Sequence, residues 1–222
     1  NKGRTLKMDM NVYTQIKELS DHYAQELAKQ VLQREKEMQK DDNAHYLLYR
    51  VLGVTNKEGS LIDLYQNKGR FLYKYAGAFL EEATAICIRS RYPQAEKKRI
   101  PNTLSIRPKT FEIDSLVGTI AHEIKWRDAT TDGDHITKEH TRVKAIKEHG
   151  YTPVRVMFYY PQRAQARKIQ ETLETLYHGV GGKYYYGDAA WKYISEFTGI
   201  DLLEILEVIA QSRDNAYEIN YE

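Results

Sequence analysis

Cysteine is nearly absent from this chain of 222 residues, and so are long apolar runs. The single cysteine, Cys87, excludes an internal disulfide framework and any zinc finger built on cysteines. Its neighbours Ala85, Ile86 and Ile88 are apolar, which favours a small core residue over a nucleophile. No run approaches the roughly 20 apolar residues of a membrane span, and no signal-peptide pattern opens the chain. We therefore expect no membrane partner and a cytoplasmic location.

A large excess of charge of one sign is also lacking. The chain carries 33 Lys and Arg residues against 31 Asp and Glu residues, a net charge of +2. This balance argues against a protein that coats nucleic acid non-specifically, but not against an enzyme whose acidic metal site offsets a basic surface. The chain has no glycine-rich phosphate loop and no nucleophile elbow, which argues against an ATPase and against a hydrolase with a serine nucleophile.

Length and apolar periodicity predict a single domain over residues 1–222, with a mainly helical portion over 1–95. Apolar residues recur at steps of three and four from Val12 to Leu27, in a helix expected to end near Lys40. An α/β core is expected over 96–187 and C-terminal helices over 188–222. The expected later helices cover residues 42–52, 60–90 (with a break left open near 67–69), 135–149, 162–178, 188–197 and 201–212.

The strands of the core are expected to form one sheet. A strand, a helix and a second strand follow one another between Glu123 and Tyr160, which predicts a parallel pair with a right-handed crossover. Residues 182–187 fit either a short strand or a loop. Together with a hairpin that contains Asp114, these elements predict a mixed β-sheet with helices on both faces.

Two carboxylates and a lysine are concentrated in the segment FEIDSLVGTIAHEIKW. We expect strands over 111–114 and 119–126, joined by a turn over 115–118. If these strands pair antiparallel, Asp114 lies within a few residues of Glu123. Because side chains alternate along a strand, Glu123 and Lys125 share one face and His122 points to the other.

This combination of residues suits the hydrolysis of phosphodiesters. Carboxylate oxygens bind divalent metals, and a cation can contact a phosphate and help to activate water. A carboxylate and a lysine buried side by side are costly unless something compensates them. The plainer alternative is a salt bridge on an exposed edge. The preceding Asp114, the strand context and the polar loop RDATTDGDH favour a metal-dependent nuclease.

Asp114 followed by Glu123-Ile124-Lys125 resembles the catalytic signature of the PD-(D/E)XK nuclease superfamily, to which most type II restriction endonucleases belong. Ile113 stands where the signature has proline. The longer tract that contains EIKWRDATTDGDHITKEHTR and YYYGDAAW resembles the ApaLI-like restriction enzymes. The resemblance implies a restriction-endonuclease-like α/β fold, with a mixed β-sheet flanked by helices, and a location in the bacterial cytoplasm.

The resemblance also implies roles for individual residues. Asp114, Glu123 and the backbone carbonyl of Ile124 would hold Mg²⁺, while Lys125 would contact the scissile phosphate and orient or activate water. Restriction enzymes of this superfamily often add a glutamate from an upstream helix. Glu82 is the candidate, because it falls at the margin of the apolar stripe of its helix, whereas Glu81 points nearly opposite. A surface acid is the alternative reading of Glu82.

The expected partner is double-stranded DNA, cut at a short palindrome by a homodimer with two-fold symmetry. Candidates for reading base edges are Arg127, Asp128, Thr130 and Thr131. A basic run around Pro101 and Pro108, expected to be a loop, offers further phosphate contacts, foremost Arg107 and Lys109 and also Lys97, Lys98 and Arg99.

Competing motifs are weaker. Asp128, Asp132, Gly133 and Glu139 partly match a calcium loop, but a strand is expected before them in place of a helix. The histidines have no spacing typical of a zinc site. Two other functions stay open: a structure-specific or repair nuclease such as a junction resolvase, and a non-catalytic DNA-binding protein.

Overall fold

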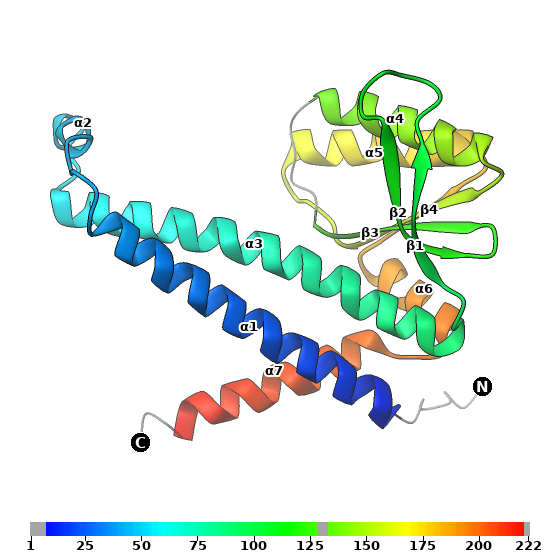
Figure 1. Ribbon diagram of the computed structural model, residues 1–222, viewed down its shortest axis with the longest axis horizontal. Coiled ribbons are helices and arrows are strands. Elements are labelled where there is room, and N and C mark those ends of the chain that lie inside the picture. Colours follow the sequence, from blue (N-terminus) through cyan, green and yellow to red (C-terminus); the bar gives the residue numbers. More distant parts are fainter. Residues whose placement is uncertain (1–7, 128–132, 220–222) are drawn as a thin grey trace. The chain divides into compact units, whose positions relative to one another are not determined.

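The computed structural model describes residues 8–127 and 133–219 (Figure 1). It confirms the predicted fold class, an α/β protein with a five-stranded mixed sheet flanked by helices and an N-terminal helical portion. The chain divides into two compact units. Glu18–Phe79 form the helical unit, and the residues up to Lys17 together with those from Leu80 onward form the α/β unit. In the described ranges no helix is long and apolar enough to cross a membrane.

The helical unit is built from parts of α1 (Met10–Met38) and α3 (Asn56–Arg91) with α2 (Tyr46–Val51) between them. A capping box starts α3: the N–H of Glu58 donates to Thr55 Oγ1, and the N–H of Thr55 donates to Glu58 Oε2. The helix then continues without the break left open near 67–69. At Gly59 an added Cβ would lie 2.5 Å from the Tyr49 ring, so only glycine allows α2 to pack this closely on α3.

The sheet has the strand order β1-β2-β3-β4-β5. The first three strands pair antiparallel, and β3, β4 and β5 run parallel, as expected for β3 and β4 from the strand–helix–strand order. The bounds are β1 Glu96–Pro101, β2 Thr110–Val117, β3 Ile120–Arg127, β4 Thr152–Tyr159 and β5 Lys183–Tyr186. Residues 183–186 are therefore a strand and not a loop.

Two local predictions were wrong. The turn expected over 115–118 is shorter, because residues 115–117 are buried and continue β2; Val117 pairs with Ile120, and Gly118 takes the positive φ of 58° that the tight connection needs. The basic run expected as a loop contains β1, where Lys97 and Arg99 both pair with Glu112 of β2. Opposite charges on neighbouring strands thus stabilise a strand that apolar alternation did not reveal.

Helices cover both faces of the sheet (Figure 1). On one face α4 (Gly133–Glu148) and α5 (Ala164–Gly179) pack through two apolar clusters, one with Ala145 and Ile146 of α4 and one with Leu173 and Tyr177 of α5. α6 (Asp188–Thr198) lies on the other face, and α7 (Leu202–Ile219) follows it.

His122 points toward α6, as strand alternation predicted. Its Nε2 lies 2.8 Å from Tyr193 Oη and its Nδ1 lies 3.1 Å from the Ser115 carbonyl. Burial lowers the pKa of His122 to about 4. The ring is therefore a neutral core group, and the opposite face of β3 is left for Glu123 and Lys125.

Candidate active site

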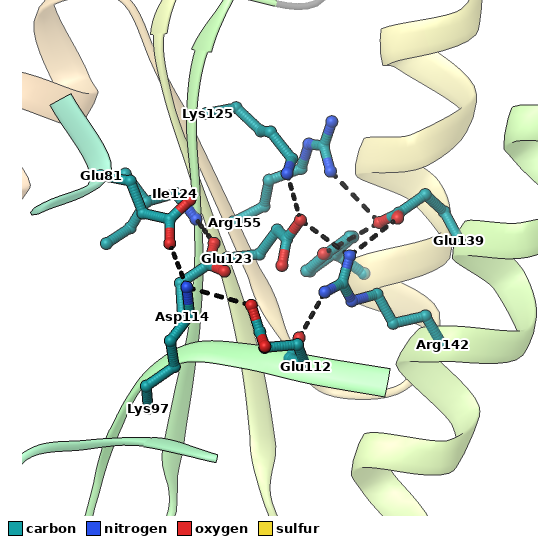
Figure 2. Close-up of polar contacts among 11 residues, drawn as sticks. Glu81, Lys97, Glu112, Asp114, Glu123, Ile124, Lys125, Glu139, Arg142 and Arg155 are labelled. Carbon is teal, nitrogen blue, oxygen red and sulfur yellow. Dashed lines mark hydrogen bonds and ion pairs between the residues drawn. The ribbon is translucent and has the colours of Figure 1, made fainter. Parts of the chain in front are cut away.

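Asp114, Glu123 and Lys125 lie together where β2 and β3 run side by side (Figure 2). The paired residues of these strands extend from Val117–Ile120 to Ser115–His122, one step short of Asp114. At the next step the carboxylate of Asp114 accepts the N–H of Ile124 at 2.8 Å. The Asp114 side chain therefore substitutes for a backbone partner, which fixes it against β3.

Glu123 is the centre of the polar contacts. Lys125 Nζ lies 2.6 Å from Glu123 Oε1, which places both side chains on one face of β3. Arg142 Nη1 of α4 lies 2.7 Å from the same oxygen. The Glu123 side chain is 3% exposed and that of Lys125 is 35% exposed. The second oxygen, Glu123 Oε2, is buried and has no hydrogen-bond partner in the part of the chain that is described.

The electrostatics follow from burial. Desolvation, followed by the neighbouring charge of Glu123 and a smaller effect of Glu81, raises the pKa of Asp114 to about 7. Lys125 and the N–H of Ile124 oppose this rise only in part. Burial by itself would lower the pKa of Lys125, but Glu123 and Asp114 outweigh burial and hold that pKa above its ordinary value. Near neutral pH the metal-free site thus has a carboxylic acid that is partly protonated and a lysine that stays charged.

A second group of charged side chains, from α4 and β4, lies beside Glu123 (Figure 2). Glu139 accepts hydrogen bonds from Arg155 at 3.2 Å, from Arg142 at 3.3 Å and from the Tyr177 hydroxyl at 3.4 Å. The Arg155 side chain is fully buried, and Arg155 pairs with Glu123 along the β3–β4 ladder. The sequence-based reasoning missed Arg142 and Arg155. A usable signal existed for Arg155, which interrupts the otherwise uncharged strand TPVRVMFY.

The partial match to a calcium loop, already judged weak from the sequence, is not supported by its last ligand. Glu139 is buried and paired with two arginines, and α4 follows a strand, not a helix. Asp128 and Asp132 lie outside the described residues.

The donor set around Asp114 fits a magnesium ion. Mg²⁺ usually takes one or two carboxylates and keeps several waters. Over residues 8–127 and 133–219 no group of three or more His, Cys, Asp and Glu residues is arranged to hold a metal. Asp114 and Glu123 nevertheless provide two adjacent carboxylates, and Glu123 Oε2 is a buried acceptor that nothing else in the described structure satisfies. The contact recorded for Ile124 uses its N–H, so a role for its carbonyl stays a prediction.

Of the two adjacent helical glutamates, Glu81 has the recorded effects on the site, and the role expected for Glu82 stays a prediction. Glu81 Oε1 lies 2.7 Å from Lys97 and its charge acts on Asp114, whereas Glu82 is exposed. The helix phase differs from the one inferred: at about 100° per residue, the buried face is rotated by roughly a full residue step from the apolar stripe read between Leu72 and Ile86. The buried residues here are Leu80, Ala83, Thr84, Cys87 and Ile88.

The predicted DNA contacts fall into three groups. Arg127 ends β3, is exposed and lies near the Trp126 ring, 5.6 Å from its centroid. Arg107 and Lys109 are exposed in the connection between β1 and β2. Asp128, Thr130 and Thr131 lie outside the described residues.

Comparison with protein-family models matches residues 8–211 to the family described as ApaLI-like restriction endonuclease. Searches of curated proteins and of solved structures give no match. The matched range includes the whole sheet and every side chain of the candidate site.

Proposed function

Because this chain belongs to the ApaLI-like restriction endonuclease family, and is thus a nuclease that acts on DNA, we propose that it is a type II enzyme of the PD-(D/E)XK superfamily. It would use Mg²⁺ to hydrolyse one phosphodiester bond in each strand of a short palindromic duplex site. The observation that carries this proposal is the meeting of Asp114, Glu123 and Lys125, with one Glu123 oxygen left without a partner.

Asp114 and Glu123 would hold the metal, together with the carbonyl of Ile124. When bound, Mg²⁺ lowers the pKa of a water molecule and stabilises the negative charge that develops on the phosphoryl group. Burial, followed by the neighbouring charge of Glu123, opposes the ionisation of Asp114 and raises its pKa. A divalent cation would offset that opposition, so metal binding and ionisation of Asp114 would be coupled.

Lys125 would act as a cation and not as a base. Its raised pKa keeps the ammonium group protonated, and its side chain is the most exposed of the three. An ammonium group at this position can contact the scissile phosphate and orient the attacking water. It also adds positive charge where the reaction builds negative charge.

A second copy of the chain would supply the second active site that a palindrome requires. The helical unit has the apolar surface for such an association. Between Leu47 and Tyr73 its large exposed apolar side chains, between 44% and 73% exposed, are Leu47, Leu48, Val51 and Leu52 with Leu61, Ile62, Tyr65, Leu72 and Tyr73. At roughly 150 Å² for a side chain of this size they present on the order of 800 Å², which is about what each partner buries in a standard interface.

Digestion of a plasmid of known sequence, with the cut ends mapped, tests the proposal. We expect fragments with defined ends in Mg²⁺, none in EDTA and none with Lys125→Ala. Random degradation, or cutting only at branched DNA, would favour a repair or structure-specific nuclease. Cutting that is unaffected by EDTA and by Lys125→Ala would leave Glu123 and Lys125 as a mere salt bridge.

A further inference from the structure

Arg142 of α4 connects three elements through one guanidinium group (Figure 2). Nη1 donates to Glu123 Oε1 at 2.7 Å and to Glu139 Oε1 at 3.3 Å. Nη2 donates to the backbone carbonyl of Glu112, two residues before Asp114 on β2. The side chain is only 15% exposed. Arg142 therefore ties the strand that carries Asp114 to the carboxylate of Glu123.

The contacts of Glu123 are divided unequally between its two oxygens. Oε1 receives two cationic donors, Lys125 and Arg142, whereas Oε2 receives none from the described residues. A buried carboxylate oxygen without a partner is costly in free energy, most of all when the group is charged. Two other contacts of the guanidinium, with Glu139 and with the Glu112 carbonyl, hold it in place and so keep it on Oε1 of Glu123.

We propose that Arg142 is a positioning residue that holds Glu123 by Oε1 and so presents Oε2 to the catalytic metal. This inference rests on the metal-dependent function proposed above and deepens it. Partners in the second layer of a metal site commonly change metal affinity by about 10–100-fold when they are replaced. Arginine suits the task because its planar fork can bond a carboxylate and a carbonyl at once, whereas lysine carries its charge on a single atom.

A purely electrostatic role for Arg142 predicts the opposite result. A fixed positive charge 2.7 Å from a metal-binding carboxylate repels a cation, so its removal would tighten metal binding. Positioning predicts that removal weakens metal binding. The two roles are separated further by Arg142→Lys, which keeps the charge and loses the fork.

The experiment is a titration of metal-free protein with Mn²⁺, followed by the electron paramagnetic resonance signal of the free ion, without DNA. We expect the dissociation constant to rise about tenfold in both Arg142→Lys and Arg142→Met. Arg99→Lys is the matched control: Arg99 is exposed and bonds the Glu112 carboxylate, so the dissociation constant should not change. Thermal unfolding establishes that each variant is folded.

Each outcome decides the proposal. Wild-type affinity in Arg142→Lys, with tighter binding in Arg142→Met, would overturn it in favour of a charge effect. If Arg142→Met does not fold, the lysine variant alone decides. If the wild-type chain binds no Mn²⁺, the metal-dependent function fails and this inference with it. If the wild type binds Mn²⁺ and Arg142→Lys binds equally well, only the inference fails.

Discussion

The two units of the chain depart from the ordinary pattern of a folded protein in opposite ways. Among the described residues, every buried charged side chain lies in the α/β unit: Asp114, Glu123, Glu139 and Arg155. The helical unit instead exposes a run of large apolar side chains from Leu47 to Tyr73. Buried charges without a function, and apolar surface without a partner, both oppose stability. The difference matches the division proposed above, in which the α/β unit carries the chemistry and the helical unit the association.

The largest effect is expected on the rate of DNA cleavage, when a buried charge is removed from the site. Glu123→Gln keeps the shape of the side chain but loses the charge that would bind the metal, so the rate of DNA cleavage should fall by about 1,000-fold or more. Glu96→Gln is the control, because Glu96 is exposed at the edge of the same sheet and pairs only with Lys98 among the ion pairs described. Initial cleavage rates measure both. A Glu123 variant within tenfold of the wild type would contradict the assignment.

The second largest effect is expected on stability, when a charge pair is broken in each of the two units. Glu139→Gln removes the charged carboxylate that lies 3.2 Å from the fully buried Arg155 and should lower the free energy of unfolding by about 3 kcal/mol or more. The exposed Glu26–Lys29 pair of the helical unit gives the comparison, and Glu26→Gln should cost less than about 1 kcal/mol. Urea denaturation measures both values. Equal losses would mean that the buried cluster has no special role in stability.

These contrasts also explain how much the sequence could predict. The fold class followed from periodicity and from the strand–helix–strand order, and the resemblance to the ApaLI-like family is confirmed. Asp114, Glu123 and Lys125 could be grouped because all three lie in one hairpin, where spacing determines proximity. Arg142 and Arg155 come from α4 and β4, and no local pattern states which distant side chain reaches Glu123.

The phase of the helix that carries Glu81 and Glu82 was hard to read for a related reason. The apolar stripe of a helix faces the elements that pack against it. Along its length α3 passes from the helical unit into the α/β unit, so those elements change. Its buried face therefore changes direction between Leu72, which is exposed, and Ile88, which is fully buried. The stripe read from Leu72 to Ile86 spans this change and favoured Glu82, whereas the contact with Lys97 and the effect on Asp114 belong to Glu81.

The pH dependence of stability is expected to be a smaller effect of the same buried charges. An acid whose pKa is raised on folding, here from 3.8 to about 7 in Asp114, binds more protons when folded. Stability therefore falls as pH rises from about 4 to about 7 and is flat above that range. Asparagine cannot ionise, so Asp114→Asn lacks this loss. In EDTA its free energy of unfolding should rise relative to that of the wild type by on the order of 3 kcal/mol across this pH window. Urea denaturation at each pH tests this, and a constant difference would contradict the burial of an uncompensated Asp114.

The smallest effect on stability is expected at the exposed apolar surface. Leu48→Gln with Leu52→Gln should change the free energy of unfolding of one chain by less than about 0.5 kcal/mol, because both side chains are already exposed. The same pair should shift a dimer to monomers in light scattering after gel filtration, whereas Lys29→Gln should not. A wild-type chain that is monomeric at micromolar concentration would remove the proposed role of this surface.

The most direct test of the site is the position of a bound metal in a crystal soaked with Mn²⁺. We predict an anomalous peak about 2.0–2.2 Å from Glu123 Oε2 and from an oxygen of Asp114, with Arg142 still on Glu123 Oε1. A peak on Glu81 and Glu112 alone, or Glu123 turned so that Oε1 binds the ion, would contradict the account.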